Sequence, residues 1–195
     1  MADARKPCVI LGSGRPHGRT RDTIRIAFPN DTVEVVALAD KVVQQYGFVS
    51  ADGRDDFLSI VQKMHLANTL IFATPVYWYA MAAPLKAFFD RFFDLLDNEG
   101  GRRLKGKSVW LIATGAEPAM PEGFEIPFRR TAEYFQMRYR GEFYFRTGSG
   151  PSEAEKAALA KCGASVLMAD LSQELKSPDQ ASFHSTSLPP ERAAG

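Results

Sequence analysis

The sequence predicts a doubly wound α/β fold, in which a five-stranded parallel sheet carries helices on both faces. Short apolar runs alternate with segments of helical periodicity along the chain. Four of the five runs stop at glycine, threonine or proline before a helical segment begins, as in repeated strand–helix units. Hydrophobic residues make up 45% of the chain and charged residues 24%, which suits one globular domain with a substantial core.

Two strand–helix units are expected in the first third of the chain. Cys8–Leu11 is an apolar run that stops at a Gly-Ser-Gly turn and predicts a short buried strand. Helical character follows over Gly18–Phe28 and ends at a Pro-Asn-Asp breaker. Val33–Leu38 predicts the second strand. After a turn-rich connection, apolar residues at helical spacing predict a helix over Asp55–Ala67.

The middle of the chain contains the clearest strand, Thr69–Ala73, which ends at a Thr-Pro pair. Pro84 then opens a helix, because its missing N–H costs nothing in a first turn. An apolar stripe extends this helix to about Leu96, and Gly100-Gly101 is expected to end it.

The remaining elements continue the alternation. Ser108–Ala113 predicts the fourth strand, and a helix is expected from about Glu125 to Met137. Glu142–Arg146 predicts the fifth strand. A capping box at Ser152–Glu155 starts a last helix, which runs to about residue 175.

This order of elements leaves few topologies. Five strands that each precede a helix, joined by right-handed crossovers, favour the flavodoxin-like order 2-1-3-4-5. Residues 1–176 are expected to form this one domain. Residues 177–195 are polar and proline-containing without periodicity, which predicts a disordered tail. In a sheet of this order, ligands bind at the carboxyl ends of the strands, between the first and the third.

The loop after the first strand, Gly12–Thr20, has the composition of an anion-binding turn. Its glycines let backbone N–H groups turn inward, and a helix begins directly after it. The hydroxyls of Ser13 and Thr20 and the guanidinium groups of Arg15 and Arg19 add donors for phosphate oxygens. The loop matches neither a Walker A motif nor a GxGxxG fingerprint, which favours a monophosphate. A plain glycine turn with solvated arginines is the alternative.

The loop after the third strand, Thr74–Met81, places Tyr77, Trp78 and Tyr79 in succession. Three aromatic side chains in a row cannot all face one core, so some point into a cleft, an interface or water. A flat conjugated ring would offer them a stacking partner, and a dimer interface is the alternative. The loop Thr114–Glu117 follows the fourth strand beside the same crevice and could cover the other side of the ring.

Composition argues against several classes of function. The chain has 24 basic and 23 acidic side chains, and this balance argues against a nucleic-acid binder and, less firmly, against an acidic electron carrier. Cys8 and Cys162 form no CxxC pair, so we expect buried reduced thiols and no metal site. No apolar run approaches the roughly 20 residues that span a bilayer. The first residues do not resemble a signal peptide, and we expect a cytoplasmic protein.

Both loops resemble those of the NAD(P)H-dependent FMN reductases and flavodoxin-type quinone reductases. Gly12–Thr20 resembles the Gly-Ser-Pro-Arg-x-x-Gly-Asn-Thr phosphate loop of that group. Thr74–Trp78, followed by Pro84–Arg91, resembles its Pro-Val-Tyr-Trp…Leu-Lys-x-Phe-x-Asp-Arg signature. The order of elements extends the resemblance from residue 8 to residue 175.

The resemblance implies an FMN cofactor and a homodimer with the flavin near the subunit interface. Arg19 stands where the family has asparagine, and Gly14 stands where it has proline. No catalytic acid or base is expected, because the chemistry belongs to the flavin. The implied contacts are Ser13, Arg15, Gly18, Arg19 and Thr20 for the phosphate, and Pro75, Val76, Tyr77, Trp78, Thr114 and Gly115 for the ring.

The predicted function follows from this resemblance. NADPH or NADH passes a hydride to flavin N5, and a small acceptor is then reduced, such as a quinone, a nitro or azo compound, or free flavin. One alternative is a flavodoxin-type electron carrier without NAD(P)H oxidation of its own. Another is an FMN-free binding protein on the same fold, because a fold alone does not fix an activity.

Other polar residues have simpler interpretations. The basic cluster formed by Arg102, Arg103, Lys105 and Lys107 could receive the 2′-phosphate of NADPH, but a solvated loop is favoured. Asp55-Asp56 is expected to complement a helix dipole, and His65 to pack or lie at the surface. Phe93 lies off the apolar stripe of its helix, which indicates a dimer contact.

Overall fold

The computed structural model describes residues 6–15, 17–47, 53–96, 98–148 and 151–174. Its sheet has the order β2-β1-β3-β5-β6 with every neighbouring pair parallel, so the predicted order is confirmed. A short β4 pairs antiparallel with the end of β3. The strands are β1 (Cys8–Leu11), β2 (Glu34–Ala37), β3 (Thr69–Tyr77), β4 (Ala80–Met81), β5 (Ser108–Gly115) and β6 (Arg138–Arg146).

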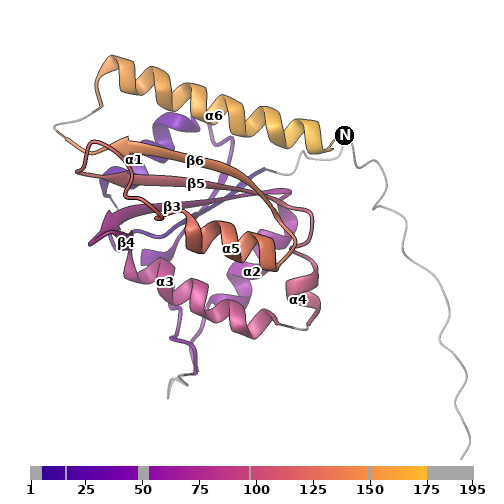
Figure 1. Cartoon of the computed structure of the whole chain (residues 1–195). Helices are drawn as coiled ribbons and strands as arrows, with labels where there is room; N and C mark the ends of the chain where they lie inside the picture. Colours follow the sequence, from indigo (N-terminus) through magenta and orange to yellow (C-terminus); the bar gives the residue numbers. More distant parts are fainter. Residues whose placement is uncertain (1–5, 16, 48–52, 97, 149–150, 175–195) are drawn as a thin grey trace, which may run out of the picture.

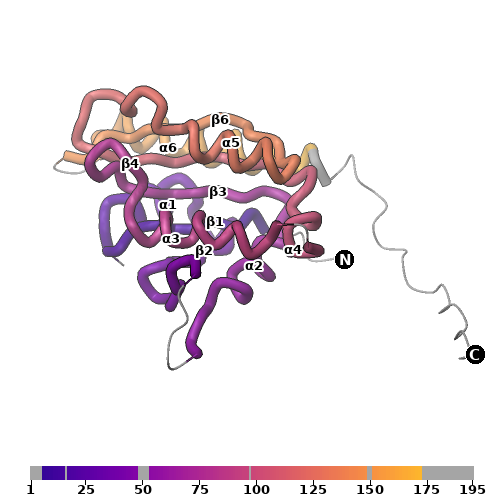
Figure 2. Tube along the Cα trace, turned by 60° about the horizontal axis from the view of Figure 1, so that its bottom comes forward, coloured from indigo at the N-terminus to yellow at the C-terminus, as the bar shows by residue number. Residues whose placement is uncertain are grey.

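Helices cover both faces of the sheet (Figure 1). One face carries α2, α3 and α5, and the other carries α1 and α6. The β4 turn and α4 lie at opposite ends of the sheet in both views (Figure 2). The helices are α1 (Arg19–Ala27), α2 (Phe57–Leu66), α3 (Ala83–Asp90), α4 (Glu99–Arg102), α5 (Ile126–Tyr134) and α6 (Glu153–Glu174), with 3₁₀ turns η1 (Leu38–Asp40) and η2 (Arg91–Leu95).

Alternating side chains of the strands build one core on each face of the sheet. In β1, Cys8 and Ile10 belong to the core under α2, α3 and α5, whereas Val9 and Leu11 belong to the core under α1 and α6. This alternation is the two-residue period of a strand. Because both faces are covered, β1 is an unbroken apolar run, as the sequence predicted.

Both cysteines are free and buried, Cys8 in β1 and Cys162 in α6. Burial raises the pKa of each thiol to about 12. The cause is that a thiolate loses its hydration inside the protein. Both side chains are therefore protonated packing groups at neutral pH, with little reactivity.

The segment expected as one helix from Pro84 to Leu96 is divided. The α-helix ends at Asp90, and η2 continues the segment. Gly100-Gly101 lies within α4 and does not end the preceding helix. A Cβ on Gly101 would lie 2.2 Å from the Leu95 carbonyl oxygen, so glycine permits the chain to fold back against η2.

β6 begins at Arg138, earlier than the predicted Glu142. It is an edge strand whose side chains alternate between exposed and half-buried, so no continuous apolar run marks its first half. The register with β5 shifts at Val109/Trp110, and Gly141 nearby has a φ of 128°. Such a bulge needs the conformational freedom of glycine.

α6 begins at Glu153, and the predicted capping box is confirmed. The Ser152 N–H donates to the Glu155 carboxylate at 2.7 Å, and the Glu155 N–H donates to Ser152 Oγ at 3.3 Å. The predicted disordered tail lies outside the described residues. Within the described part of the chain, no helix has the length and apolar character of a membrane span.

Candidate functional site

The β1–α1 loop, which the sequence singled out, lies at the carboxyl edge of the sheet, against residues on either side of the Thr74–Met81 segment. The Gly12 N–H donates to the Ala73 carbonyl at 2.8 Å, which joins the end of β1 to β3. A Cβ on Gly12 would lie 2.4 Å from Leu85 Cβ, so the β1–α1 loop passes directly against α3. Only glycine allows this approach. The contact lies at the point where the winding of the sheet reverses.

The N-terminus of α1 is open to an anion. Gly18 precedes the helix and provides no side-chain cap. The N–H groups of Gly14, Arg19 and Thr20 have no acceptor among the described residues. Unpaired N–H groups at the start of a helix attract negative charge through their partial charges and the helix dipole. The backbone here therefore fits a phosphate.

Ser13 shapes this loop from inside. Its buried hydroxyl accepts the Arg15 N–H at 3.1 Å and donates to the Arg15 carbonyl at 3.3 Å. The side chains of Arg15, His17 and Arg19 are exposed around the turn. Two guanidinium groups therefore lie beside the open N–H groups, and residue 16 lies outside the described part of the chain.

Thr20 and Thr114 join the loop to the centre of the sheet. Their hydroxyl oxygens lie 2.7 Å apart, and both side chains are buried. Both residues are predicted to contact a cofactor, and in the structure their hydroxyls also bond to each other. A buried hydrogen bond of this kind fixes the position of both side chains. Thr20 therefore anchors the first turn of α1 and offers its N–H to an anion.

The segment expected as a loop over Thr74–Met81 is a β-hairpin, which corrects the prediction. β3 continues through Pro75 and Val76 to Tyr77, which pairs with Ala80 of β4. The two-residue turn between these strands needs positive φ at both positions, which normally selects Asn-Gly. The turn residues here are aromatic, so the sequence carried no hairpin signal.

Trp78 and Tyr79 occupy this turn with φ of 48° and 63°. Bulky residues rarely adopt this conformation, and retained strain of this kind is typical of functional sites. Trp78 is 93% exposed and Tyr79 is 70% exposed. The Ala82 N–H donates to Thr74 Oγ1 at 3.1 Å and closes the base of the hairpin. A rigid turn thus presents aromatic faces to the solvent.

β5 also continues beyond its predicted end, through Thr114 and Gly115. β6 holds the loop that follows: the Tyr144 hydroxyl and Arg146 Nε donate to loop carbonyls at 2.9 and 3.0 Å. A Cβ on Gly115 would lie 2.6 Å from the Tyr144 hydroxyl oxygen. The sequence analysis missed Tyr144 and Arg146, because their role depends on the β5–β6 pairing and no motif marks them.

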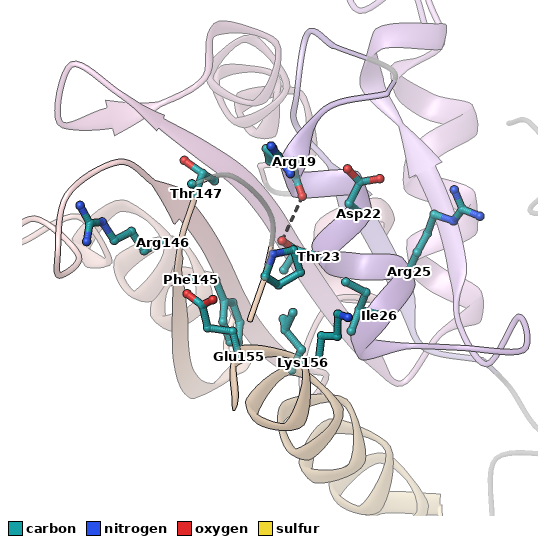
Figure 3. A pocket seen from close by; sticks show the side chains of 13 residues that line it. Arg19, Asp22, Thr23, Arg25, Ile26, Phe145, Arg146, Thr147, Glu155 and Lys156 are labelled. Carbon is teal, nitrogen blue, oxygen red and sulfur yellow. Dashed lines mark hydrogen bonds between the residues drawn. The ribbon is translucent and has the colours of Figure 1, made fainter. Parts of the chain in front are cut away.

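A hollow of about 510 Å³ lies between α1, the end of β6 and the start of α6 (Figure 3). Arg19 lines it and also belongs to the anion-binding loop. None of residues 74–81 lines it. The aromatic hairpin therefore forms no part of this hollow, whereas the β1–α1 loop reaches it through Arg19.

Arg91, the last residue of the Pro84–Arg91 signature segment, has a structural role. The Arg91 guanidinium pairs with the carboxylates of Asp55 and Asp94 at 2.5 Å each. It also lies 4.6 Å from the centre of the Phe57 ring. Asp55 Oδ1 accepts the Phe57 N–H at 3.1 Å, so this residue does serve the start of α2 as predicted. Asp56 instead accepts the N–H of residue 42 at 2.9 Å.

The basic cluster lies at the opposite edge of the sheet, before β5 begins. Lys107 is buried, and its ammonium group donates to the His65 carbonyl at 3.0 Å and to the Ala67 carbonyl. It therefore caps the end of α2, so the expectation of a solvated loop is wrong for this lysine. The alternative of a 2′-phosphate site does not fit either, because the anion-binding loop lies at the carboxyl edge.

His65 predicts a pH dependence of stability. Its Nε2 lies 2.8 Å from the Gly100 carbonyl oxygen, which only accepts, so Nε2 carries the proton. Burial, together with the charges of Arg103 and Lys107, lowers the pKa of His65 below its usual 6.5. The unfolded chain then takes up a proton more readily than the folded chain. The contribution of His65 to the free energy of unfolding is therefore fully present above about pH 6.5, and it is lost as the pH decreases below this value.

Urea unfolding between about pH 7.5 and pH 5 measures this effect. The matched variant is His65→Gln, whose amide keeps a donor for Gly100 but does not titrate. The variant should show a flatter pH dependence than the natural chain. Equal slopes in the two proteins would contradict the assignment to His65.

Comparison with known sequences points to one protein family. A family model described as NADPH-dependent FMN reductase matches residues 6–151. YwqN of Bacillus subtilis (strain 168), whose name describes an NAD(P)H-dependent FMN-containing oxidoreductase, is 27% identical over 177 residues. The alignment covers 84% of this chain and 96% of that protein.

Solved structures share the fold. The Trp repressor binding protein from Bacillus subtilis has a TM-score of 0.64 at 23% identity, and the match covers 80% of this chain and 97% of that chain. General stress protein 14 from Treponema denticola, in complex with FMN, has a TM-score of 0.61 at 21% identity. That match covers 86% of this chain and 99% of the other. At these identities the two structures show the common architecture alone.

Proposed function

The chain belongs to the NADPH-dependent FMN reductase family, and from this premise we propose how its residues hold the cofactor. It is an NAD(P)H-dependent FMN oxidoreductase. One observation carries the assignment of the site. The β1–α1 loop, which contacts α3, leads into an uncapped helix start with unpaired N–H groups, and α3 itself follows directly after an exposed aromatic hairpin in the chain. A phosphorylated planar ring matches both parts.

The phosphate end of FMN is assigned to the β1–α1 loop. The N–H groups of Gly14, Arg19 and Thr20 are available to it, and Arg15 and Arg19 supply positive charge. Hydrogen bonds to a charged phosphate contribute roughly 1.5–3 kcal/mol each, more than the helix dipole. The hydroxyls of Ser13 and Thr20 hold the loop in shape.

The ring of FMN is assigned to the ends of the two central strands. Pro75, Val76 and Tyr77 end β3, and Trp78 follows them at the hairpin tip. Thr114 and Gly115 end β5 beside them. These elements are rigid, so they orient a planar group more accurately than mobile loops would.

FMN, when bound, supplies hydride chemistry at its N5. The strand ends would position the ring, and NAD(P)H and then a small acceptor would bind to it in turn. The acceptor class is a quinone, a nitro or azo compound, or free flavin. The protein's contribution is binding and orientation, so no catalytic side chain is assigned.

The proposal includes a homodimer in the cytoplasm. Phe93 is 61% exposed, and its ring centre lies 5.1 Å from that of Tyr46. This exposed aromatic pair, of which Phe93 lies on η2, supports a subunit contact. The free thiols of Cys8 and Cys162 are consistent with a reducing compartment. The molar mass in solution, measured by light scattering, tests the dimer.

The activity is tested on the purified chain loaded with FMN. We expect a flavin absorption spectrum that bleaches when NADPH or NADH is added without air, and recovers when a quinone is supplied. A colourless protein that binds no added FMN would overturn the cofactor assignment. Bound FMN that neither dinucleotide bleaches would overturn the reductase activity.

The phosphate assignment is tested by Arg15→Ala. We expect the affinity for FMN to fall about tenfold, because one charge-assisted hydrogen bond is lost. The affinity for riboflavin, which has no phosphate, should stay unchanged. Arg102→Ala removes an exposed arginine at the other edge of the sheet and is the matched control. Equal losses for FMN and riboflavin would contradict the placement of the phosphate.

A further inference from the structure

Of the residues that line the hollow between α1 and α6, only Arg19 takes part in the FMN assignment. The volume of this hollow, about 510 Å³, lies within the range of small-molecule sites. We infer that it binds the adenosine 2′-phosphate end of NADPH, an inference that rests on the proposed function. Its lining, its charge and its position beside the β1–α1 loop favour this ligand.

The lining is amphipathic. Ile26 of α1, Phe145 of β6 and Leu159 of α6 contribute apolar surface (Figure 3). A purine base is a flat apolar body that packs on aromatic and aliphatic side chains. The hydroxyl of Thr23, at the same wall, is already bonded to the Arg19 carbonyl at 3.0 Å.

The rim carries an excess of positive charge. Its four basic side chains are Arg19, Arg25, Arg146 and Lys156, and its two acidic side chains are Asp22 and Glu155. Glu155 is engaged by Ser152 in the capping box at 2.7 and 2.8 Å, and Lys156 is paired with Glu153 at 2.6 Å. Arg19 and Arg25 pair with no carboxylate among the described residues. Such a rim favours a phosphate over a neutral or cationic ligand.

Two rim residues connect the hollow to the flavin site. Arg19 is the first residue of α1 and belongs to the anion-binding loop. Arg146 donates through Nε to the Ala116 carbonyl at 3.0 Å, in the loop that follows β5. The hollow therefore adjoins the β1–α1 loop, which is assigned to the FMN phosphate, and through Arg146 it adjoins the loop that follows β5. The other end of a dinucleotide whose nicotinamide lies on the flavin is assigned to this hollow.

Binding is tested with adenosine 2′,5′-bisphosphate as the probe, titrated by calorimetry into the FMN-loaded full chain. The variant is Lys156→Ala, which removes a rim charge whose own partner is the exposed Glu153 at 2.6 Å. The matched control is Lys161→Ala, an exposed lysine on the same helix that does not line the hollow. We expect Lys156→Ala to weaken the probe about tenfold and Lys161→Ala to leave it unchanged.

The same variants are compared in steady-state kinetics. Lys156→Ala should raise KM for NADPH about tenfold and leave KM for NADH and kcat unchanged, because NADH has no 2′-phosphate. Equal probe affinity in all three proteins, while NADPH still bleaches the flavin, would overturn the site and leave the proposed function intact. If neither dinucleotide bleaches the flavin in the natural chain, the proposed function is refuted, whether or not the probe binds.

Discussion

Replacing Trp78-Tyr79 with Asn-Gly is expected to weaken FMN binding about tenfold or more and to raise the melting temperature of the apoprotein. The affinity should fall because stacking of a base on an aromatic side chain contributes roughly 1–3 kcal/mol. The stability should rise because Asn and Gly tolerate the positive φ that Trp78 and Tyr79 now adopt. Strained residues of this kind each cost roughly 1–3 kcal/mol.

Flavin fluorescence quenching measures the affinity of this double variant, and calorimetry measures its melting temperature. Tyr134→Asn is the matched control, because it removes another exposed aromatic side chain, on α5, without changing the hairpin. The control should keep its affinity for FMN. A double variant that is more stable and binds FMN as tightly as the natural chain would show that the aromatic tip does not contact the ring.

Gly163→Ala is expected to lower the free energy of unfolding by about 3 kcal/mol. A Cβ at this position would lie 1.7 Å from the carbonyl oxygen of Ala27. The atom it meets belongs to the backbone of α1, so no side-chain rotation can relieve the overlap. The two helices would have to separate, which opens the core formed by Ile24, Leu159 and Val166.

Urea unfolding measures the loss in Gly163→Ala. Gly148→Ala is the control, since a Cβ there meets nothing within 4 Å and φ needs no glycine. The control should unfold within about 0.5 kcal/mol of the natural chain. A Gly163→Ala protein with the stability of the control would show that α1 and α6 adjust freely.

The fold was predictable where burial alone decides the pattern. β1 and the first part of β3 are covered on both faces, so Cys8–Leu11 and Thr69–Ala73 are continuous apolar runs. The start of β6 was missed because an edge strand mixes charged and half-buried residues. The division between α3 and η2 was missed because the apolar stripe continues across it through Phe92 and Leu95.

The site was predictable in position but not in detail. The topology alone placed Gly12–Thr20 beside the segment after the third strand. The bond between Thr20 and Thr114 joins residues that are 94 apart in the chain, so it depends on how α1 packs on β5. The role of Lys107 was hidden for the same reason, because only the fold brings it to the end of α2. Local sequence carries no record of either contact.

FMN bound at the uncapped start of α1 would make the stability of the protein depend on the supply of its cofactor. A ligand that binds only the folded chain adds about 2.7 kcal/mol at a free concentration of about 100 times its Kd. The apoprotein, with backbone donors satisfied by water alone, lacks this contribution. Proteases degrade the unfolded fraction, so newly made chains in a riboflavin-starved cell should turn over faster. The amount of the protein in the cell would then follow the supply of flavin, without a separate regulatory protein.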